Sequence, residues 1–194
     1  MKPLNLRKCI ACALLAAVSV VLFLIQVPTP LTPEYLKLDL SDLPALLAGY
    51  FLGIPYGIIV CLLKNATGLF HTFTGGVGEL SNFILSSAFV LGSGLIYRKN
   101  QNLRGAALGA AVGALAAAAV SFPSNLFLVY PVYGRLMGMD AILGMYRALL
   151  PGVEKLWQGL LVFNVPFTLV KCLLSGFAAV LVWKPLKQVR ILNE

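Results

Sequence analysis

Three ionisable side chains lie within or beside long apolar runs of this sequence, namely Lys64, Glu79 and Lys171. A charged group among apolar residues is costly, so it usually lines a binding site or pairs with another charge. Lys171 lies midway along its apolar run and cannot easily extend to a polar surface. We therefore expect Lys171 to face a ligand, with an internal ion pair as the alternative. Lys64 could extend to an interface, and Glu79 could cap a helix N-terminus.

Three asparagines, Asn82, Asn125 and Asn164, also stand beside or within apolar runs. Each amide could contact a ligand or could simply bridge two helices. In the segment 28–44, Leu36, Leu38 and Leu40 alternate with polar residues. This alternation predicts an extended segment with one apolar face, which either covers a pocket as a lid or lies at a lipid interface.

The composition predicts an all-α integral membrane protein. Of the 194 residues, 59% are hydrophobic and only 11% are charged, and the mean hydropathy is +0.88. Soluble domains are about 45–50% apolar and about 25% charged, and a soluble fold of this length could not hide so much apolar surface. We therefore expect a single domain, residues 1–194, in a cell membrane, with several spans in contact with the lipid bilayer.

The basic residues form three clusters that flank the apolar runs, around Arg7, Arg98 and Lys184. Cytoplasmic loops carry such clusters, and all three lie on one side only if the chain crosses six times. The sixth crossing requires a helix break near Pro55, where the sequence reads GIPYG. We therefore expect cytoplasmic N- and C-termini and an external loop over residues 28–42. The six expected helices cover residues 9–27, 43–53, 56–71, 79–98, 103–133 and 158–184.

Several kinds of function lack the residues they would need. The sequence has no P-loop, no HExxH and no GxSxG motif, and its single histidine, His71, cannot form a metal cluster. No basic run is interleaved with aromatic residues, so nucleic-acid binding is not expected. An intramembrane hydrolase would have to use His71 and remains the enzyme alternative. The small residues Ala13 and Ala17 could pack inside the chain or present a flat face to another membrane protein.

Taken together, four segments resemble the substrate-binding S component of energy-coupling factor vitamin transporters, most closely its riboflavin-specific branch. The similarity runs through nearly the whole chain. The order and spacing of these segments carry the resemblance. They are YLKLDLSDLP (residues 35–44), TGGVGELSNF (residues 74–83), Asn125 with YPVY (residues 130–133), and PFTLVK (residues 166–171).

The resemblance implies six helices, an externally placed flavin pocket under the first loop, and no enzymatic activity. It also implies a transmembrane coupling protein and two ATPase subunits as partners, with Ala13 and Ala17 facing the coupling protein. Riboflavin would be the transported ligand, with no cofactor, and the family positions that bind it match Glu79, Asn125 and Lys171. Where the riboflavin branch usually has asparagine, this chain has Thr168, and Asn164 could partly substitute for it. Leu38 and Leu40 of the lid complete the expected site, and the same fold with another vitamin is the alternative.

Overall fold

The computed structural model describes residues 6–29, 32–33, 36–72 and 75–188, and the described chain is almost entirely helical. The longer helices are α1 (Leu6–Leu24), α2 (Asp42–Phe51), α3 (Ile54–Gly68), α4 (Val77–Lys99), α5 (Leu103–Ser124) and α9 (Val165–Lys187). The shorter ones are η1 (Leu69–His71), η2 (Asn125–Val129), α6 (Tyr130–Met137), α7 (Met139–Leu149), α8 (Leu156–Gly159) and η3 (Leu160–Asn164). The strands are β1 (Val27–Pro28) and β2 (Lys37–Leu38).

Four helical stretches in the described chain are long and apolar enough to cross a membrane. They are Leu6–Leu24, Val77–Lys99, Leu103–Met137 and Leu156–Lys187. Their lipid-facing residues remain exposed in the isolated chain, as expected for a protein whose solvent is hydrocarbon. The helices α2 and α3 have 10 and 15 residues, and each is shorter than the roughly 20 residues that span a bilayer.

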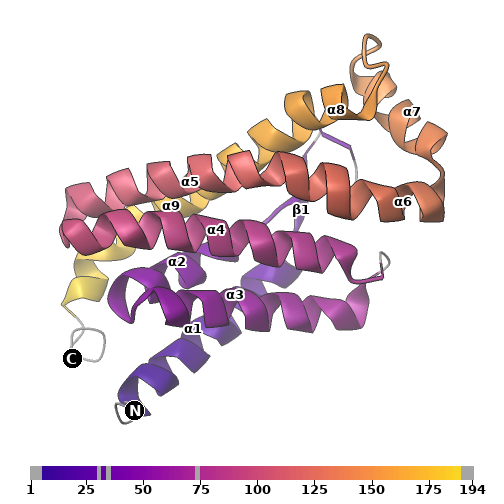
Figure 1. The fold of residues 1–194 in the computed structure, drawn as a ribbon. Coiled ribbons are helices and arrows are strands. Elements are labelled where there is room, and N and C mark those ends of the chain that lie inside the picture. The colour runs from indigo at the N-terminus through magenta and orange to yellow at the C-terminus, as the bar shows by residue number, and fades with distance from the viewer. Residues whose placement is uncertain (1–5, 30–31, 34–35, 73–74, 189–194) are drawn as a thin grey trace.

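The chain does turn between α2 and α3, at the GIPYG sequence. Gly53 has φ 116°, a conformation that favours glycine, and Pro55 lies in the first turn of α3, where its missing N–H costs no helical hydrogen bond. Figure 1 shows α2 and α3 side by side, with α4 and α5 above them and the N-terminus below. The turn places both short helices against the longer ones.

The longest interface joins α4 and α5, and small residues make it close. A Cβ atom on Gly113 would lie 2.0 Å from Ser93 Oγ and 2.4 Å from the Phe89 carbonyl oxygen. A Cβ atom on Gly109 would lie 2.6 Å from the Ser93 carbonyl oxygen. Gly105, Gly109 and Gly113 recur every four residues along α5, and this small-residue repeat serves packing within the chain.

The two continuous helical stretches Leu103–Met137 and Leu156–Lys187 each contain one wide, π-helical turn. These turns are η2, which begins at Asn125, and η3, which ends at Asn164. Each is followed by a proline, Pro131 or Pro166, at the start of the next helix. Proline clashes with the carbonyl four residues earlier, and a wide turn relieves that clash without ending the helix. Both helical stretches therefore have a wide turn where their asparagines lie.

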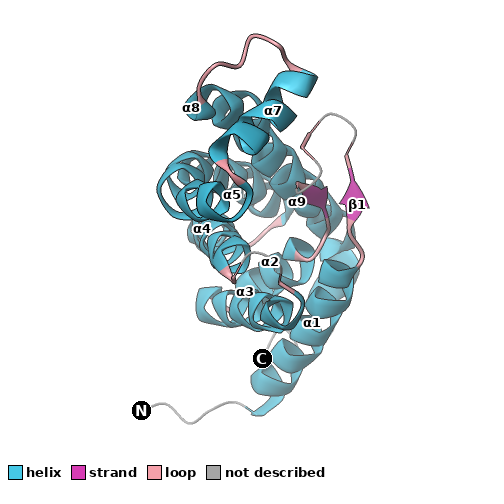
Figure 2. Cartoon of the chain, turned by 90° about the vertical axis from the view of Figure 1, so that its right-hand side faces the viewer, coloured by secondary structure: helices cyan, strands magenta, loops and turns pink. Residues whose placement is uncertain are grey.

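The segment between α1 and α2 forms a two-stranded antiparallel pair in which Val27 is opposite Leu38. Figure 2 shows β1 near the ends of α1 and α9, on the side away from the N-terminus. The alternation in this segment predicted that its leucines share one apolar face, which covers a pocket or lies at a lipid interface. In the structure Asp39 and Ser41 are buried instead, and Leu40 is 38% exposed. Hydrogen bonds and ion pairs of Asp39, described below, account for this difference.

Candidate functional site: a polar cavity at one end of the helices

A cavity of about 630 Å³ lies at the end of the molecule opposite the basic clusters. It is lined by the ends of α1 and α3, the start of α2, the N-terminal parts of α4 and α9, the short elements η2, η3 and α6, and the loop residues Leu36, Lys37 and Asp39. Small-molecule sites commonly enclose about 300–1,000 Å³ and combine apolar walls with a few polar groups. Five of the seven predicted ligand residues line this cavity: Glu79, Asn125, Asn164, Thr168 and Lys171.

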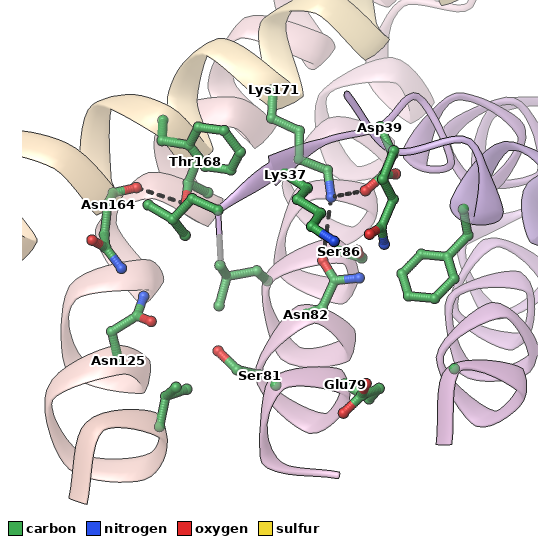
Figure 3. A pocket seen from close by; sticks show the side chains of 18 of the residues that line it. Lys37, Asp39, Glu79, Ser81, Asn82, Ser86, Asn125, Asn164, Thr168 and Lys171 are labelled. Atoms are coloured by element: carbon green, nitrogen blue, oxygen red, sulfur yellow. Dashed lines mark hydrogen bonds and ion pairs between the residues drawn. The ribbon is translucent and has the colours of Figure 1, made fainter. Parts of the chain in front are cut away.

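Two amides form one polar part of the cavity, and Figure 3 shows them on facing helices. The Asn125 amide nitrogen donates to the Ser121 carbonyl oxygen at 2.7 Å, while its amide oxygen is a remaining acceptor. Thr168 Oγ1 lies 2.9 Å from the Asn164 carbonyl oxygen and 3.1 Å from Ser121 Oγ. The Thr168 hydroxyl is therefore engaged by protein groups.

The Asn164 side chain is held by two buried tyrosines. Its amide oxygen accepts from the Tyr146 hydroxyl at 2.6 Å, and its amide nitrogen donates to the Tyr130 oxygen at 3.0 Å. The two tyrosine hydroxyls also contact each other. A primary amide has two donors and two acceptor positions, so one of each remains for a ligand. This arrangement fixes the amide plane and connects the cavity to α6 and α7.

Lys171 enters the cavity from α9 and is paired with the loop. Its Nζ lies 2.8 Å from Asp39 Oδ2 and 3.5 Å from Asn82 Oδ1, and the residue is only 8% exposed. An ammonium group has three donors, so the described hydrogen bonds leave one for a ligand acceptor. Lys171 thus both lines the cavity, as expected, and forms an internal ion pair. Figure 3 shows Lys171 and Asp39 in contact.

A second ion pair lies beneath the first, between Lys64 and Asp42. Lys64 is fully buried, and its Nζ contacts Asp42 Oδ1 and lies 2.8 Å from Ser41 Oγ. Ser86 Oγ donates to the same Asp42 oxygen at 2.6 Å. Lys64 therefore does not extend to an interface, because a buried carboxylate neutralises its charge inside the protein.

Glu79 lies in the first turn of α4, at the mouth of the cavity. Its Oε2 accepts a hydrogen bond from Thr72 Oγ1 at 2.9 Å. The helix begins after Gly76, which has a left-handed conformation. Because Glu79 lies in the first turn, its carboxylate also complements the positive end of the helix dipole. Both expectations for this residue, a cavity position and a favourable helix-start position, are compatible with this geometry.

The other predicted residues lie elsewhere. Leu38 and Leu40 line a second, apolar cavity of about 380 Å³ between α1, the loop and α9. Their placement differs from the expectation because Asp39, between them, turns inward to Lys171. Ala13 and Ala17 lie on the exposed face of α1, whereas Ala16 is buried.

Sequence reasoning missed Asp39 and Asp42 as site residues. Both appear in the sequence beside leucines that seemed to define the functional face of the loop. The available signal was charge balance: two lysines in apolar runs require buried acids, and the whole chain has only seven acidic residues. Which acid pairs with which lysine depends on contacts across more than a hundred residues.

Apolar helices around a partly open cavity with several polar side chains in its wall define a multi-pass membrane protein with a site for a small molecule. The chain belongs to the family of ECF transporter substrate-specific components, whose family model matches residues 7–183. This family consists of transporter components and not enzymes. The hydrolase alternative therefore has no support, and the His71 side chain on which it depended lies outside the described part of the structure.

Several characterised relatives match most of the chain. It is 27% identical to the riboflavin transporter RibU of Staphylococcus aureus over 93% of this chain and 90% of the relative. It is 28% identical to RibU of Streptococcus thermophilus over 96% of this chain and 86% of the relative. It is 30% identical to the riboflavin transporter FmnP of Bacillus subtilis over 67% of this chain and 70% of the relative.

A solved structure of the S component of a bacterial ECF transporter has a similar fold. The TM-score is 0.74 at 27% sequence identity, and the match covers 93% of this chain and 95% of the other. The helical arrangement described above is therefore the S-component fold.

Proposed function

We propose that this protein is the riboflavin-capturing component of an ECF importer. The observation that carries the proposal is the cavity, because five polar groups at the positions expected for a flavin site line a single space of suitable volume. The names of the relatives, which are riboflavin transporters, support riboflavin as the ligand. The flat ring lies between apolar side chains, and its polar edge meets the fixed groups.

The polar edge of a flavin ring has both donors and acceptors. Asn125 supplies an amide oxygen, Asn164 supplies one donor and one acceptor, and Lys171 supplies an N–H for a ring carbonyl. Glu79 lies at the opposite part of the cavity and accepts hydrogen bonds from the hydroxylated chain. Thr168 contributes indirectly, because its hydroxyl is hydrogen-bonded to Ser121 and to the Asn164 backbone. A hydroxyl forms fewer hydrogen bonds than the asparagine usual at this position, and the Asn164 side chain partly compensates for this difference.

The proposed topology has six crossings with both termini in the cytoplasm. The basic residues at the ends of α1, α4 and α9 support it, because they lie at the end away from the cavity. The short α2 fits this topology because the preceding loop dips inward to Asp39 and Asp42, so α2 begins well below the outer surface. The cavity then opens toward the outside of the cell.

A transmembrane coupling protein and two ATPases are the proposed source of energy. The exposed Ala13 and Ala17 give α1 a flat strip against which another membrane helix can pack closely. Such small-residue strips favour close helix contact in lipid. The surface of α1 around this strip is apolar, with Leu14 64% and Val18 50% exposed.

The test is a titration of the purified protein with riboflavin, followed by quenching of the emission of Trp157 and Trp183. We expect saturable quenching, and protein purified from riboflavin-containing cells should carry a yellow ligand. The departure at Thr168 favours one alternative, a different vitamin in the same fold. Competition with an unrelated vitamin such as biotin distinguishes the two, because displacement by biotin but not by riboflavin would contradict our proposal.

A further inference from the structure

Two lysines and two aspartates form one buried, charge-balanced cluster between the loop and the helices. The four residues are Asp39, Asp42, Lys64 and Lys171, and none is more than 8% exposed. The cluster joins the loop to α2, α3 and α9, and its total formal charge is zero. In such a cluster the choice of partner is not fixed by charge, because either lysine could pair with either acid.

The distances show which pairing the structure adopts. Lys171 Nζ is 2.8 Å from Asp39 Oδ2 but 3.8 Å from Asp42 Oδ2. Asp42 is engaged at its other oxygen by both Lys64 and Ser86. Asp42 could therefore compete with Asp39 for Lys171, but Lys64 already neutralises the charge of Asp42.

We propose that Lys64 is a positioning residue that engages Asp42 and thereby directs Lys171 to Asp39, which holds the loop over the cavity. Without the Lys64 charge, Asp42 would have one cation within reach, and Lys171 would move from Asp39 toward it. The loop would lose its ion pair with α9, although Lys64 has no place in the cavity lining. Asp39 also accepts a hydrogen bond from the Ser41 backbone N–H at 2.9 Å. A movement of Asp39 would therefore weaken this hydrogen bond as well.

The inference rests on the proposed riboflavin function only for its second readout. The first readout is hydrogen–deuterium exchange of the ligand-free, full-length protein, measured on peptides that contain residues 36–40. For Lys64→Met we expect exchange in this loop to rise about tenfold while exchange in α5 stays at its wild-type rate. The second readout is riboflavin dissociation, which we expect to be about tenfold faster, equivalent to about 1.4 kcal/mol.

The charge-balanced variant Lys64→Met/Asp42→Asn provides the decisive comparison. It removes one cation and one anion together, so Lys171 has no second acid to choose, and we expect loop exchange to return to within about threefold of wild type. Ser175→Ala is the matched control, since Ser175 is fully buried on α9 one turn beyond Lys171 and its hydroxyl has no hydrogen-bond partner among the described residues. It should leave both readouts unchanged.

Three results would overturn the inference: unchanged loop exchange in Lys64→Met, an equal rise in every helix, or no recovery in the double variant. If Lys64→Met cannot be purified, Ser86→Ala weakens the hold on the same Asp42 oxygen without changing charge. A smaller rise in loop exchange would then support the inference, and none would contradict it. If wild-type protein binds no riboflavin, the proposed function fails while the exchange measurement still decides this inference.

Discussion

At the scale of single residues, the cavity depends on side chains whose orientation is fixed by other protein groups. Asn164 is held by Tyr130 and Tyr146, and Lys171 is held by Asp39. Such prior ordering lowers the entropy cost of binding, since the groups need not be immobilised by the ligand. The cost is a dependence on buried charge, because losing one member of an ion pair leaves the other unpaired.

The substitution Lys171→Met tests this dependence. We expect riboflavin affinity to fall about tenfold to hundredfold, because one charge-assisted hydrogen bond is lost and the loop loses its partner. We also expect lower thermal stability, because Asp39 would remain buried without its cation. Titration and thermal unfolding in detergent measure the two effects.

The matched control for that substitution is Lys184→Met, which removes an exposed lysine from the same helix. It should change neither affinity nor stability appreciably. Wild-type affinity in Lys171→Met would show that the ammonium group does not face the ligand.

At the scale of helices, close packing and two wide turns place the cavity groups. The repeat of small residues on α5 lets α4 approach it, and the π-helical turns η2 and η3 contain Asn125 and Asn164. A π-helical turn contains one more residue than a regular turn. In a regular helix each asparagine would therefore point in a different direction relative to the residues that follow it. The two facing amides are thus a consequence of where the prolines lie.

The substitution Gly113→Ala tests the α4–α5 contact. A methyl group there would lie 2.0 Å from Ser93 Oγ and 2.4 Å from a backbone oxygen of α4, so the helices must separate. We expect a loss of about 1–3 kcal/mol of stability, seen as a lower unfolding temperature in detergent.

The comparison variant is Gly144→Ala on α7, where an added methyl group would meet nothing within 4 Å. Since alanine is the better helix former, this variant should be as stable as wild type or slightly more so. Equal unfolding temperatures for both variants would mean that α4 and α5 are not packed as described.

At the scale of the whole molecule, the clusters of basic residues are separated from the cavity. Basic residues cluster at one end of the helices, while the cavity and its balanced ion pairs occupy the other. In the proposed topology the basic clusters remain in the cytoplasm, and the end with the cavity faces the outside of the cell. An apolar outer surface around a charge-neutral interior makes this arrangement compatible with lipid.

The proposed orientation predicts the labelling of single cysteines in intact cells. A cysteine introduced at the exposed Gly152, between α7 and α8, should react with a membrane-impermeant maleimide added outside. A cysteine introduced at the exposed Asn100, between α4 and α5, should react only after the membrane is permeabilised. The unsubstituted protein, with three buried cysteines and Cys9 near the N-terminus, gives the background. The reverse pattern would contradict the proposed topology.

The sequence by itself determined that the chain lies in lipid, that a helix breaks near Pro55, and that four polar residues, Glu79, Asn125, Asn164 and Lys171, were candidates for a binding site. These features follow from local quantities: hydropathy, the steric limits of glycine and proline, and the cost of charge in lipid. The family resemblance added the positions of the ligand groups, because similar residues recur in the same order along the chain.

Only the tertiary structure decided which acids neutralise which lysines, that Asp39 rather than Leu38 turns inward, and that two tyrosines fix Asn164. Each of these depends on a contact between segments distant in the sequence, from 16 residues for Tyr130 and Tyr146 to 132 for Asp39 and Lys171. Alternation along a strand predicts which side chains share a face, but not which face is buried. In this loop a buried cation outweighs the burial of leucine, because an unpaired charge in a low-dielectric interior costs more than an exposed apolar side chain in lipid.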